Sequence, residues 1–332
     1  MGKEKIAIIG SGNWGSAIAK IAGQNAARQP DLFEASRIPM WVFEEDVNGR
    51  KLTEIINETH VNEKYLPGIK LPENVYATSD LEETVKNATA FIFVLPHQFL
   101  GKTIEQLKGK IAPGAKGITL IKGVDVSESH INIFADTIEQ ELGISCSALS
   151  GANIADEETE NFRVQTIGDV HGVSLCGALK NIVAVAAGFM DGLEWGDNAK
   201  AAIMRNGLIE MKEFTLEFFK DAKAETFFQE SAGVADLMTS CMGGRNRKCA
   251  EAFVKTGKSF KDLEQEMLGG QISIVTAQDI HKFLKAKNRV EGYPLFEAVY
   301  QCAFEGRDVT TVTKSLNAKR PTNSDKTTQS SL

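Results

Sequence analysis

A glycine-rich turn near the start of the chain holds the first residues whose types and spacing could do chemistry. It follows an apolar, strand-like run at Ile6–Ile9 and opens a helix-like stretch that extends to Ala27. The first glycine permits a tight turn, the second lets the backbone approach a ligand, and the third lets helix and strand pack closely. The start of a helix also offers free N–H groups and partial positive charge to a phosphate. The pattern favours a bound dinucleotide over the alternative, a purely structural glycine turn. The residues of the turn are Gly10, Ser11, Gly12, Asn13, Trp14 and Gly15.

Three acidic residues follow the next apolar run. The run Met40–Phe43 ends in Glu44, Glu45 and Asp46. An acid at this point of a dinucleotide-binding fold hydrogen-bonds the adenosine ribose and repels a 2'-phosphate, which favours NAD over NADP. The polar stretch Arg28–Arg37 accounts for the long spacing from the glycines as a loop insertion. The alternative is an ordinary acidic turn in solvent.

Lys180 stands inside a long apolar stretch, with Leu175–Leu179 before it and Ile182–Val185 after it. Burial disfavours the charged amine and would lower the pKa of Lys180 toward the range in which a lysine exchanges protons with a substrate. The alternative is a lysine whose stem lies on apolar surface while its amine reaches water.

A second candidate cation, Arg245, and its neighbour Asn246 follow the glycine pair Gly243–Gly244. A guanidinium fork fits phosphate geometry, and flanking glycines let the backbone come close to a ligand. Because further basic residues and a glycine pair also mark plain turns, a solvated basic turn is the alternative.

The first half of the chain alternates strand-like and helix-like segments, which predicts an α/β fold with a doubly wound parallel sheet, the Rossmann arrangement. Lys122 follows the last residue of one strand, at the edge of the sheet where such folds place ligands. The expected strands are Ile6–Ile9, Met40–Phe43, Phe91–Leu95, Gly117–Ile121 and Ser147–Ser150. The expected helices are Trp14–Ala27, Lys51–Glu58, Asp80–Asn87, Gln98–Ile111 and Ser127–Leu142.

The second half has helical periodicity throughout, and we expect an all-helical domain. Its apolar stretches include Val173–Met190, Lys200–Lys220 and Thr276–Lys287. The end of the chain is poor in large apolar residues and is predicted to be a mobile tail. We therefore expect an NAD-binding domain over 1–168, a substrate domain over 169–314 and a tail over 315–332.

Composition excludes several classes of function. The 332 residues carry a formal net charge of −7, which argues against binding nucleic acid or anionic membranes as the main role. The five cysteines contain no Cys-x-x-Cys pair; we expect buried apolar thiols in a reducing, cytoplasmic compartment, with no disulfide framework and no metal site. We expect neither a secretory leader nor an apolar run of membrane-spanning length.

Several segments, in fixed order and reaching to about Gly306, resemble the NAD-dependent glycerol-3-phosphate dehydrogenase family. They are Gly10–Ala17, Trp41–Glu45, Pro96–Phe99, Ile121–Gly123, Gly151–Ala155, Cys176–Asn181, Gly196–Asn198, Gly233–Leu237 and Gly243–Lys248. The resemblance implies reversible reduction of dihydroxyacetone phosphate by NADH to sn-glycerol 3-phosphate. It also implies a doubly wound first domain, a helical second domain and a homodimer.

The resemblance also implies roles for individual residues. Lys180 would be the acid/base, Lys122 a second active-site lysine, and Asp236 the partner of Lys180, with helix N-capping as the rival role of Asp236. Asn181 and Ser240, where the family usually has threonine, would hydrogen-bond the substrate, and Arg245 with Asn246 would bind its phosphate. The implied contacts to NAD are Phe43, Phe99, Ala155, Arg245 and Gln271, although each aromatic could equally fill the core.

The chain departs from the family pattern at two places. After Glu157 the family has a further strand and helix, so that we expect the sheet to lack one edge strand and one helix. After Gln271 the loop is shorter than in the family. These departures keep two alternatives open, a catalytically impaired or inactive NAD-binding homologue and a dehydrogenase of another small hydroxy substrate.

Overall fold

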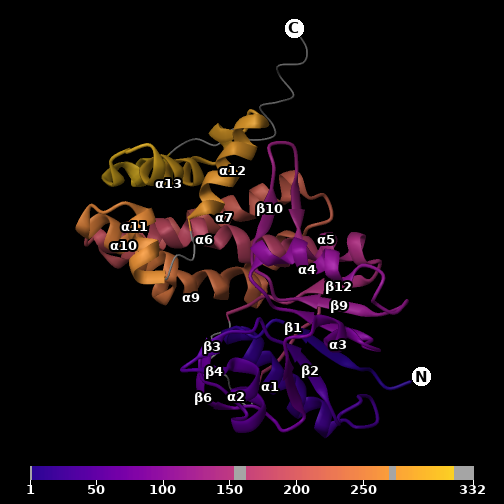
Figure 1. Cartoon of the computed structure of the whole chain (residues 1–332). Coiled ribbons are helices and arrows are strands. Elements are labelled where there is room, and N and C mark those ends of the chain that lie inside the picture. The colour runs from indigo at the N-terminus through magenta and orange to yellow at the C-terminus, as the bar shows by residue number, and fades with distance from the viewer. Residues whose placement is uncertain (1, 153–161, 269–273, 318–332) are drawn as a thin grey trace. The chain divides into compact units, whose positions relative to one another are not determined.

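The computed structural model describes residues 2–152, 162–268 and 274–317 (Figure 1). The chain divides into two compact units. The first holds Met1–Lys122, Phe134–Leu149 and Asn153–Gly168, and the second holds Gly123–Ile133, Ser150–Ala152 and Asp169–Leu332. The segment 123–133 thus belongs to the second unit, whereas a single boundary at residue 168 would assign it to the first.

The first unit is built on a six-stranded sheet whose neighbouring strands all pair in parallel. The order is β12-β9-β8-β1-β2-β7, so that the chain winds outward from β1 in both directions. This is the doubly wound arrangement, and the predicted α/β fold is confirmed. The strands are β1 (Ile6–Ile9), β2 (Ile38–Trp41), β7 (Val75–Thr78), β8 (Ala90–Phe93), β9 (Lys116–Thr119) and β12 (Ser145–Ala148).

The helices of the first unit follow the predicted positions with one clear exception. Helix α5 begins at Phe134, although the sequence predicts a helix from Ser127. A hairpin occupies the earlier residues, because Ser127 and His130 close a turn through a backbone hydrogen bond of 2.9 Å between N of Ser127 and O of His130. The helices are α1 (Asn13–Arg28), α2 (Leu52–Thr59), α3 (Leu81–Val85), the 3-10 turn η1 (His97–Phe99), α4 (Leu100–Leu107) and α5 (Phe134–Leu142).

Three two-stranded hairpins lie outside the main sheet, and the sequence predicts none of them. They pair β3 (Asp46–Val47) with β4 (Arg50–Lys51), β5 (Val61–Asn62) with β6 (Leu66–Lys70), and β10 (Val124–Val126) with β11 (Ile131–Ile133), all antiparallel. Strands of two to five residues are too short to show a period-2 pattern, which explains the omission.

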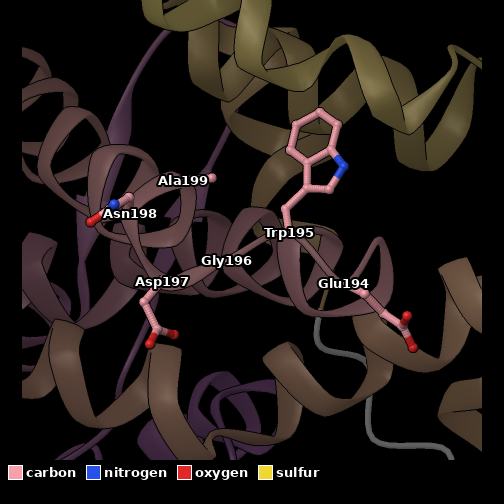
Figure 2. Close-up of a pocket in the computed structure, with 6 residues that line it drawn as sticks. All are labelled: Glu194, Trp195, Gly196, Asp197, Asn198 and Ala199. Atoms are coloured by element: carbon pink, nitrogen blue, oxygen red, sulfur yellow. The ribbon is translucent and has the colours of Figure 1, made fainter.

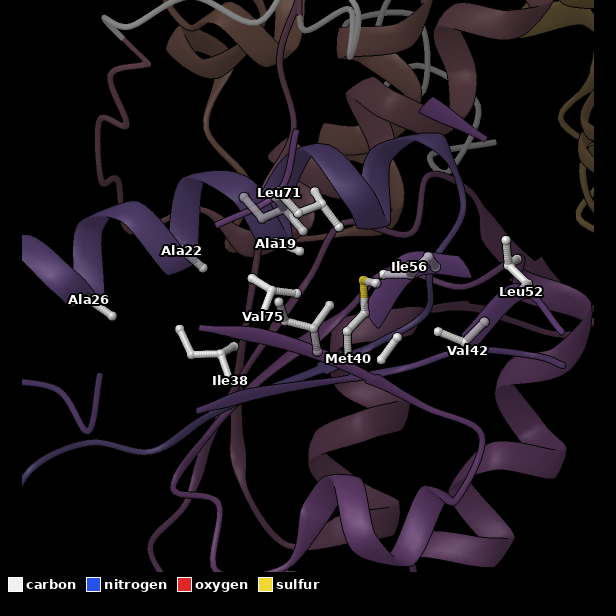
Figure 3. Packing of buried hydrophobic residues seen from close by; sticks show 13 residues of the cluster. Ala19, Ala22, Ala26, Ile38, Met40, Val42, Leu52, Ile56, Leu71 and Val75 are labelled. Carbon is white, nitrogen blue, oxygen red and sulfur yellow. The ribbon is translucent and has the colours of Figure 1, made fainter. Parts of the chain in front are cut away.

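One apolar cluster packs α1 and α2 against β1, β2 and β7 (Figure 3). Alanines on the sheet-facing side of α1 let the helix approach the strands closely, and Met40 fills the space between strand and helix with no exposed surface. Burial of this apolar surface stabilises the fold by about 25 cal/mol per Å². The labelled members are Ala19, Ala22, Ala26, Ile38, Met40, Val42, Leu52, Ile56, Leu71 and Val75.

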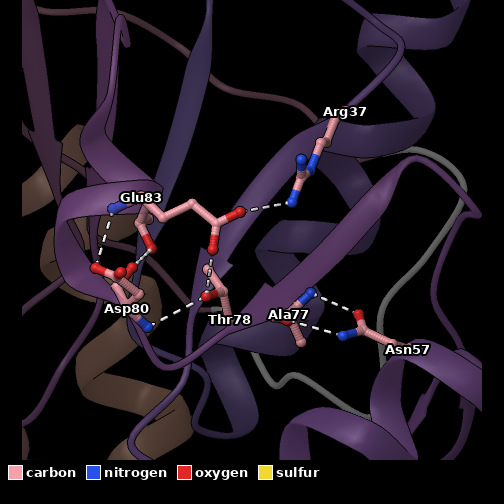
Figure 4. A network of polar contacts seen from close by, with 7 residues as sticks. Arg37, Asn57, Ala77, Thr78, Asp80 and Glu83 are labelled. Atoms are coloured by element: carbon pink, nitrogen blue, oxygen red, sulfur yellow. Dashed lines mark hydrogen bonds and ion pairs between the residues drawn. The ribbon is translucent and has the colours of Figure 1, made fainter.

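Polar contacts fix β7, an edge strand that the sequence does not predict (Figure 4). The amide of Asn57 donates to O of Ala77 and accepts from N of Ala77, both at 2.8 Å, and so takes the place of a neighbouring strand. Thr78 donates to Glu83 at 3.0 Å, and Asp80 caps α3. Long-range side-chain contacts of this kind leave no local periodicity, which is why sequence patterns miss the strand.

The second unit is helical apart from the β10–β11 hairpin in the residues described. Helix α6 packs against α7, α9 and α10, and the predicted helical domain is confirmed. The helices are α6 (Val170–Gly192), α7 (Asp197–Phe218), α8 (Ala224–Gln229), the π-turn η3 (Ser231–Ala235), α9 (Asp236–Gly243), α10 (Arg245–Thr256), α11 (Phe260–Leu268), α12 (Val275–Ala286) and α13 (Pro294–Phe304), with 3-10 turns η4 (Val290–Gly292) and η5 (Val309–Asn317).

Helix α6 is long and apolar enough to cross a membrane, contrary to the expectation from sequence. In its most apolar window, however, 89% is buried inside the protein. A helix that is hydrophobic on all sides can be buried in the centre of a large core, and α6 is the core helix of the second unit.

Two buried carboxylates fix helix starts in the second unit. Asp169 caps α6 by accepting from N of Gly172 at 2.8 Å, and it also accepts from the hydroxyl of Thr226 at 2.5 Å. Glu210, with no exposed surface, accepts from N of Leu295 at 2.9 Å and so caps α13. A carboxylate at a helix N-terminus satisfies N–H groups that have no partner within the helix.

Candidate active site

The glycine turn lies where the sequence predicts it, between β1 and α1. Gly12 is the N-cap of α1 and has no side chain to occupy the N–H groups, and the first turn of α1 contains no acidic residue. The turn is held from outside by Asn62, whose buried amide donates to O of Ser11 at 2.8 Å. Asn13 donates to O of Tyr65 at 2.9 Å. No sequence pattern points to Asn62, because nothing local links β5 to this turn.

The three glycines of the turn are required for different reasons. A Cβ on Gly10 would lie 2.7 Å from O of Val94, and one on Gly15 would lie 2.5 Å from O of Gly10. A Cβ on Gly12 would meet no heavy atom within 4 Å in the described part of the chain beyond its immediate neighbours. Packing therefore explains Gly10 and Gly15, whereas Gly12 faces open space, as expected of a residue that leaves room for a pyrophosphate.

Each acid after β2 has a partner within the first unit. Glu44 accepts from the hydroxyl of Thr53 at 2.7 Å, and N of Gly49 donates to Asp46 at 2.8 Å. Glu45 accepts from Lys64 and from the hydroxyl of Tyr65, both at 2.7 Å. Burial raises the pKa of Glu45, but these two hydrogen bonds outweigh it, and the pKa lies below its ordinary value. The ribose contact stays a prediction, since structural roles account for all three carboxylates.

Two aromatic side chains of the first unit are exposed although the sequence allows them to be core residues. Phe43 is 68% exposed and Phe99 is 50% exposed. The core alternative is wrong for both. Their exposure leaves both rings accessible to a ligand, and the contact to NAD stays a prediction.

Lys122 is exposed and follows β9 at its carboxyl end. Gly123 comes next with φ of 133°, a conformation that glycine adopts readily. Lys122 thus occupies the sheet edge where parallel folds bind ligands. The other predicted residues of this region, Ala155 and Gln271, lie outside the described residues, as does the departure after Glu157.

The amine of Lys180 is buried in the second unit, and the side chain is 7% exposed. Nζ donates to Oδ1 of Asp236 at 2.6 Å and to Oγ of Ser240 at 2.7 Å. The alternative of a lysine whose amine reaches water is therefore wrong. The carboxylate of Asp236 and the hydroxyl of Ser240 thus supply hydrogen-bond partners to a buried amine.

Helix α9 explains how two side chains meet one amine. Asp236 and Ser240 are four residues apart and so project from the same face of the helix. The N-cap of α9 is Ala235, and Asp236 is already helical; the rival role of Asp236 as an N-cap is wrong. The π-turn η3 precedes Asp236, and such turns often occur at functional sites. Its first residue, Ser231, accepts a hydrogen bond of 3.1 Å from N of Ala152.

Arg245 and Asn246 are the first two residues of α10 rather than part of a turn. Arg245 is exposed, so its phosphate role stays a prediction beside the alternative of a solvated basic segment. The N-cap, Gly244, has no side-chain hydrogen bond, and the first turn of α10 has no acidic residue. A helix start with these features attracts anions. Asn181 follows Lys180 on α6, and its amide donates a long hydrogen bond of 3.5 Å to O of Gly177.

The five cysteines are free and buried, as predicted. Burial raises the pKa of Cys146 and of Cys241 to about 12, and it raises the pKa of Cys249 and of Cys302 to about 11. Burial likewise raises the pKa of Cys176, with further repulsion from Asp169. A thiol with a raised pKa is a poor nucleophile at neutral pH.

An open pocket lies at the loop between α6 and α7 (Figure 2). The side chains of Glu194, Trp195 and Asp197 point in different directions there. A binding site usually has polar groups that converge on one point, so the pocket is a weak candidate, and it contains none of the described residues assigned to the site. Its lining is Glu194, Trp195, Gly196, Asp197, Asn198 and Ala199.

Comparison with known proteins covers both units. Residues 5–167 match the family described as NAD-dependent glycerol-3-phosphate dehydrogenase N-terminus, and residues 169–314 match the corresponding C-terminus. The chain is 48% identical to glycerol-3-phosphate dehydrogenase [NAD(+)] 1 of Schizosaccharomyces pombe, over 91% of this chain and 88% of that protein. It is 49% identical to the cytoplasmic enzyme of Mus musculus, over 93% of this chain and 96% of that protein.

Solved structures give the same answer. Glycerol-3-phosphate dehydrogenase from Saccharomyces cerevisiae has a TM-score of 0.87 at 41% identity, with 95% of this chain and 99% of that chain covered. The Plasmodium falciparum glycerol-3-phosphate dehydrogenase has a TM-score of 0.90 at 36% identity, with 97% of each chain covered. With its glycine turn, its buried lysine and matches along both units, the chain belongs to the NAD-dependent glycerol-3-phosphate dehydrogenase family.

Proposed function

We propose that this chain transfers hydride reversibly between NADH and dihydroxyacetone phosphate, and that Lys180 exchanges the proton. The observation that carries the proposal is the buried amine of Lys180, held between Asp236 and Ser240. An amine inside the protein needs such partners to remain charged. Lys180 is next to Asn181 on α6, and α6 packs against α10, which begins with Arg245. This packing supports the proposal of acid/base and phosphate-binding roles within one unit.

The chemistry requires one hydride and one proton. When bound, NADH would supply the hydride that the ketone carbon accepts. Lys180 donates a proton from Nζ to the carbonyl oxygen, which becomes the hydroxyl of sn-glycerol 3-phosphate, and the amine regains a proton from solvent before the next turnover. In the reverse direction the neutral amine accepts the hydroxyl proton. Asp236 stabilises the ammonium form of Lys180 in either direction.

The residues of the first unit fit a bound dinucleotide. The start of α1 presents N–H groups to a pyrophosphate next to the open space at Gly12, and Phe43 with Phe99 offers apolar surface to the cofactor. Arg245, Ala155 and Gln271 complete the proposed set of contacts. Lys122, Asn181 and Ser240 are proposed to hydrogen-bond the substrate.

Arg245 and Asn246 are proposed to bind the phosphate of the substrate. The N-terminus of α10 supplies N–H groups and the guanidinium supplies a fork of two donors. A dehydrogenase of another small hydroxy substrate would not need this arrangement to bind a phosphate. Arg245→Ala should therefore raise the KM for dihydroxyacetone phosphate on the order of 10- to 100-fold. An unchanged KM would favour another substrate.

The proposal is tested by mixing the purified chain with NADH and dihydroxyacetone phosphate and following the absorbance of the reduced nicotinamide. Loss of absorbance that depends on both compounds is expected. Intact NADH binding, measured by fluorescence, without any turnover would instead favour the alternative of an inactive NAD-binding homologue.

Location and assembly are the last parts of the proposal. The Mus musculus relative is named as cytoplasmic, and we place this chain in the cytoplasm as well. We also propose a homodimer, as the family resemblance implies. Light scattering of the purified chain should give twice the mass of 36.2 kDa, and a mass of one chain would contradict the dimer.

A further inference from the structure

We propose that Asp191 is a positioning residue for phosphate binding: it holds the first turn of α10, and with it Arg245, in place relative to Lys180. The inference rests on the proposed function, in which Arg245 binds the substrate phosphate. The geometry that carries it is an ion-pair cluster on α6, away from the amine of Lys180.

Asp191 binds cations from two other helices. Oδ2 accepts from Nε of Arg247 on α10 at 2.5 Å, and Lys200 of α7 donates to Oδ1 at 3.0 Å and to Oδ2 at 2.8 Å. The side chains of Asp191, Lys200 and Arg247 are only 17%, 16% and 19% exposed. A pair so shielded from water is screened far less than a surface pair, so its geometry is well defined.

The position of Asp191 on α6 links this cluster to the proposed acid/base. Asp191 follows Lys180 by eleven residues, which is close to three turns of an α-helix. The two side chains therefore project from the same face of α6. Lys180 contacts α9 from this face, and Asp191 contacts α7 and α10. One rigid helix thus carries both the proton donor and the anchor of α10.

Close backbone contact reinforces the anchor. A Cβ on Gly188 of α6 would lie 2.2 Å from O of Arg247, so α6 approaches the first turn of α10 more closely than a larger side chain permits. Arg247 is two residues from Arg245 in the same helical turn. Any displacement of Arg247 would therefore move Arg245.

The start of α10 also contacts the residues around the amine of Lys180. A Cβ on Gly244 would lie 2.4 Å from O of Ser240, and the hydroxyl of Ser240 accepts from Lys180. Arg245 is thus held on both sides, through Gly244 and Ser240 on one and through Arg247 and Asp191 on the other. Removing the charge of Asp191 leaves Lys200 and Arg247 without their common carboxylate. Arg247 keeps its partner Glu251 at 2.9 Å within α10, but it loses the ion pair to α6, and we expect the start of α10 to shift.

Asp191→Asn tests the proposal with two substrates that differ only in the phosphate. The KM for dihydroxyacetone phosphate is expected to rise on the order of 10- to 100-fold, as for other misplaced binding groups. The kcat/KM for dihydroxyacetone, which has no phosphate for Arg245 to bind, is expected to stay as in the parent chain. A purely structural role would lower kcat/KM for both substrates by the same factor, and that result would overturn the proposal.

Glu217→Gln is the matched control. Glu217 also binds an arginine of the second unit, accepting from Nε of Arg289 at 2.5 Å and from the hydroxyl of Tyr293 at 2.8 Å. This variant removes a comparable ion pair far along the chain from Arg245. The ratio of the two kcat/KM values is expected to be unchanged in Glu217→Gln, and a change equal to that of Asp191→Asn would overturn the proposal.

Two further variants make the outcome decisive. If Asp191→Asn does not fold, Arg247→Lys takes its place, because lysine keeps the charge and loses the guanidinium fork. Arg247→Lys is expected to raise the KM for the phosphorylated substrate alone. An unchanged KM overturns the proposal. In a chain that already carries Arg245→Ala, Asp191→Asn is expected to cause no further rise in the KM for dihydroxyacetone phosphate. If Arg245→Ala does not change the KM for dihydroxyacetone phosphate, the proposed phosphate role of Arg245 is refuted. If Arg245→Ala raises this KM and Asp191→Asn does not, only the inference on Asp191 is refuted.

Discussion

Lys180 has surroundings that few lysines share. Its amine is enclosed in the second unit, 2.6 Å from a carboxylate oxygen of Asp236 and 2.7 Å from the hydroxyl of Ser240. Taking both charges out of water costs several kcal/mol, which their mutual attraction and the added hydrogen bond must offset. A pair of this kind contributes little to stability, so its presence is better explained by chemistry.

Asp236→Asn tests this pair at the level of one residue. The change leaves a buried ammonium without its counter-charge, and the free energy of unfolding should fall by about 3 to 5 kcal/mol. The fall is measured by urea unfolding. Turnover should fall as well, because the protonation of Lys180 is no longer governed by a carboxylate.

Ser240→Thr is the matched control on the same helix. It keeps the hydroxyl that accepts from Lys180, and we expect activity and stability close to those of the parent chain. If Asp236→Asn were as stable and as active as Ser240→Thr, the ion pair would have no role in the site.

Among the elements, the turn between β1 and α1 contains one glycine expected to serve ligand binding, Gly12, and one that packing requires, Gly15. Gly12→Ala introduces a Cβ that meets no described part of the protein beyond its neighbours, and a change from glycine to alanine at an N-cap costs less than about 1 kcal/mol. We therefore expect Gly12→Ala to fold normally and to lose NADH affinity, because the new methyl group occupies the space of the pyrophosphate. Fluorescence titration with NADH measures the loss.

Gly15→Ala has the opposite expected result. Its Cβ would lie 2.5 Å from O of Gly10, so that strand and helix must separate at a cost of about 1 to 3 kcal/mol or more. Thermal unfolding distinguishes the two variants. A Gly12→Ala protein with normal NADH affinity would show that the open space at the turn is not the pyrophosphate site.

The sequence predicts those elements whose own residues carry the information. The strand at Ile6–Ile9 is found with the same bounds, since a buried parallel strand is a continuous apolar run. Helix α6 extends the prediction of Val173–Met190 by a few residues at each end. The strand β7 is missed, because Asn57 and Glu83 fix it from outside, and the β10–β11 hairpin is missed because a turn at Ser127 overrides the helical pattern.

Some residues of the candidate site can be predicted from the sequence and others cannot. The family resemblance names Lys180, Asp236 and Ser240, and the structure brings all three together. It does not name Asn62, which holds the glycine turn, or Asp191, which holds α10. Residues of this second kind act through contacts between distant segments, and one sequence carries no local signal for them.

For the whole molecule, burial of all five cysteines has a consequence that is simple to measure. Burial raises the pKa of Cys146 to about 12 and that of Cys302 to about 11. The reactive thiolate is therefore rare at pH 8, well below these values, and the thiols are also shielded from reagent. We expect almost no reaction of the folded chain with a disulfide reagent such as Ellman's, and five reactive thiols after denaturation. Rapid reaction of one thiol in the folded chain would show an accessible cysteine that the structure does not contain.

The most direct test of the account is the rate of NADH oxidation by dihydroxyacetone phosphate in a Lys180→Met variant, measured beside its NADH affinity. Methionine keeps an unbranched side chain of similar length and removes the exchangeable proton. We expect kcat to fall on the order of 100-fold or more, with NADH affinity unchanged, because the dinucleotide contacts proposed in the first unit remain. A folded Lys180→Met protein that oxidises NADH at the rate of the parent chain would contradict it.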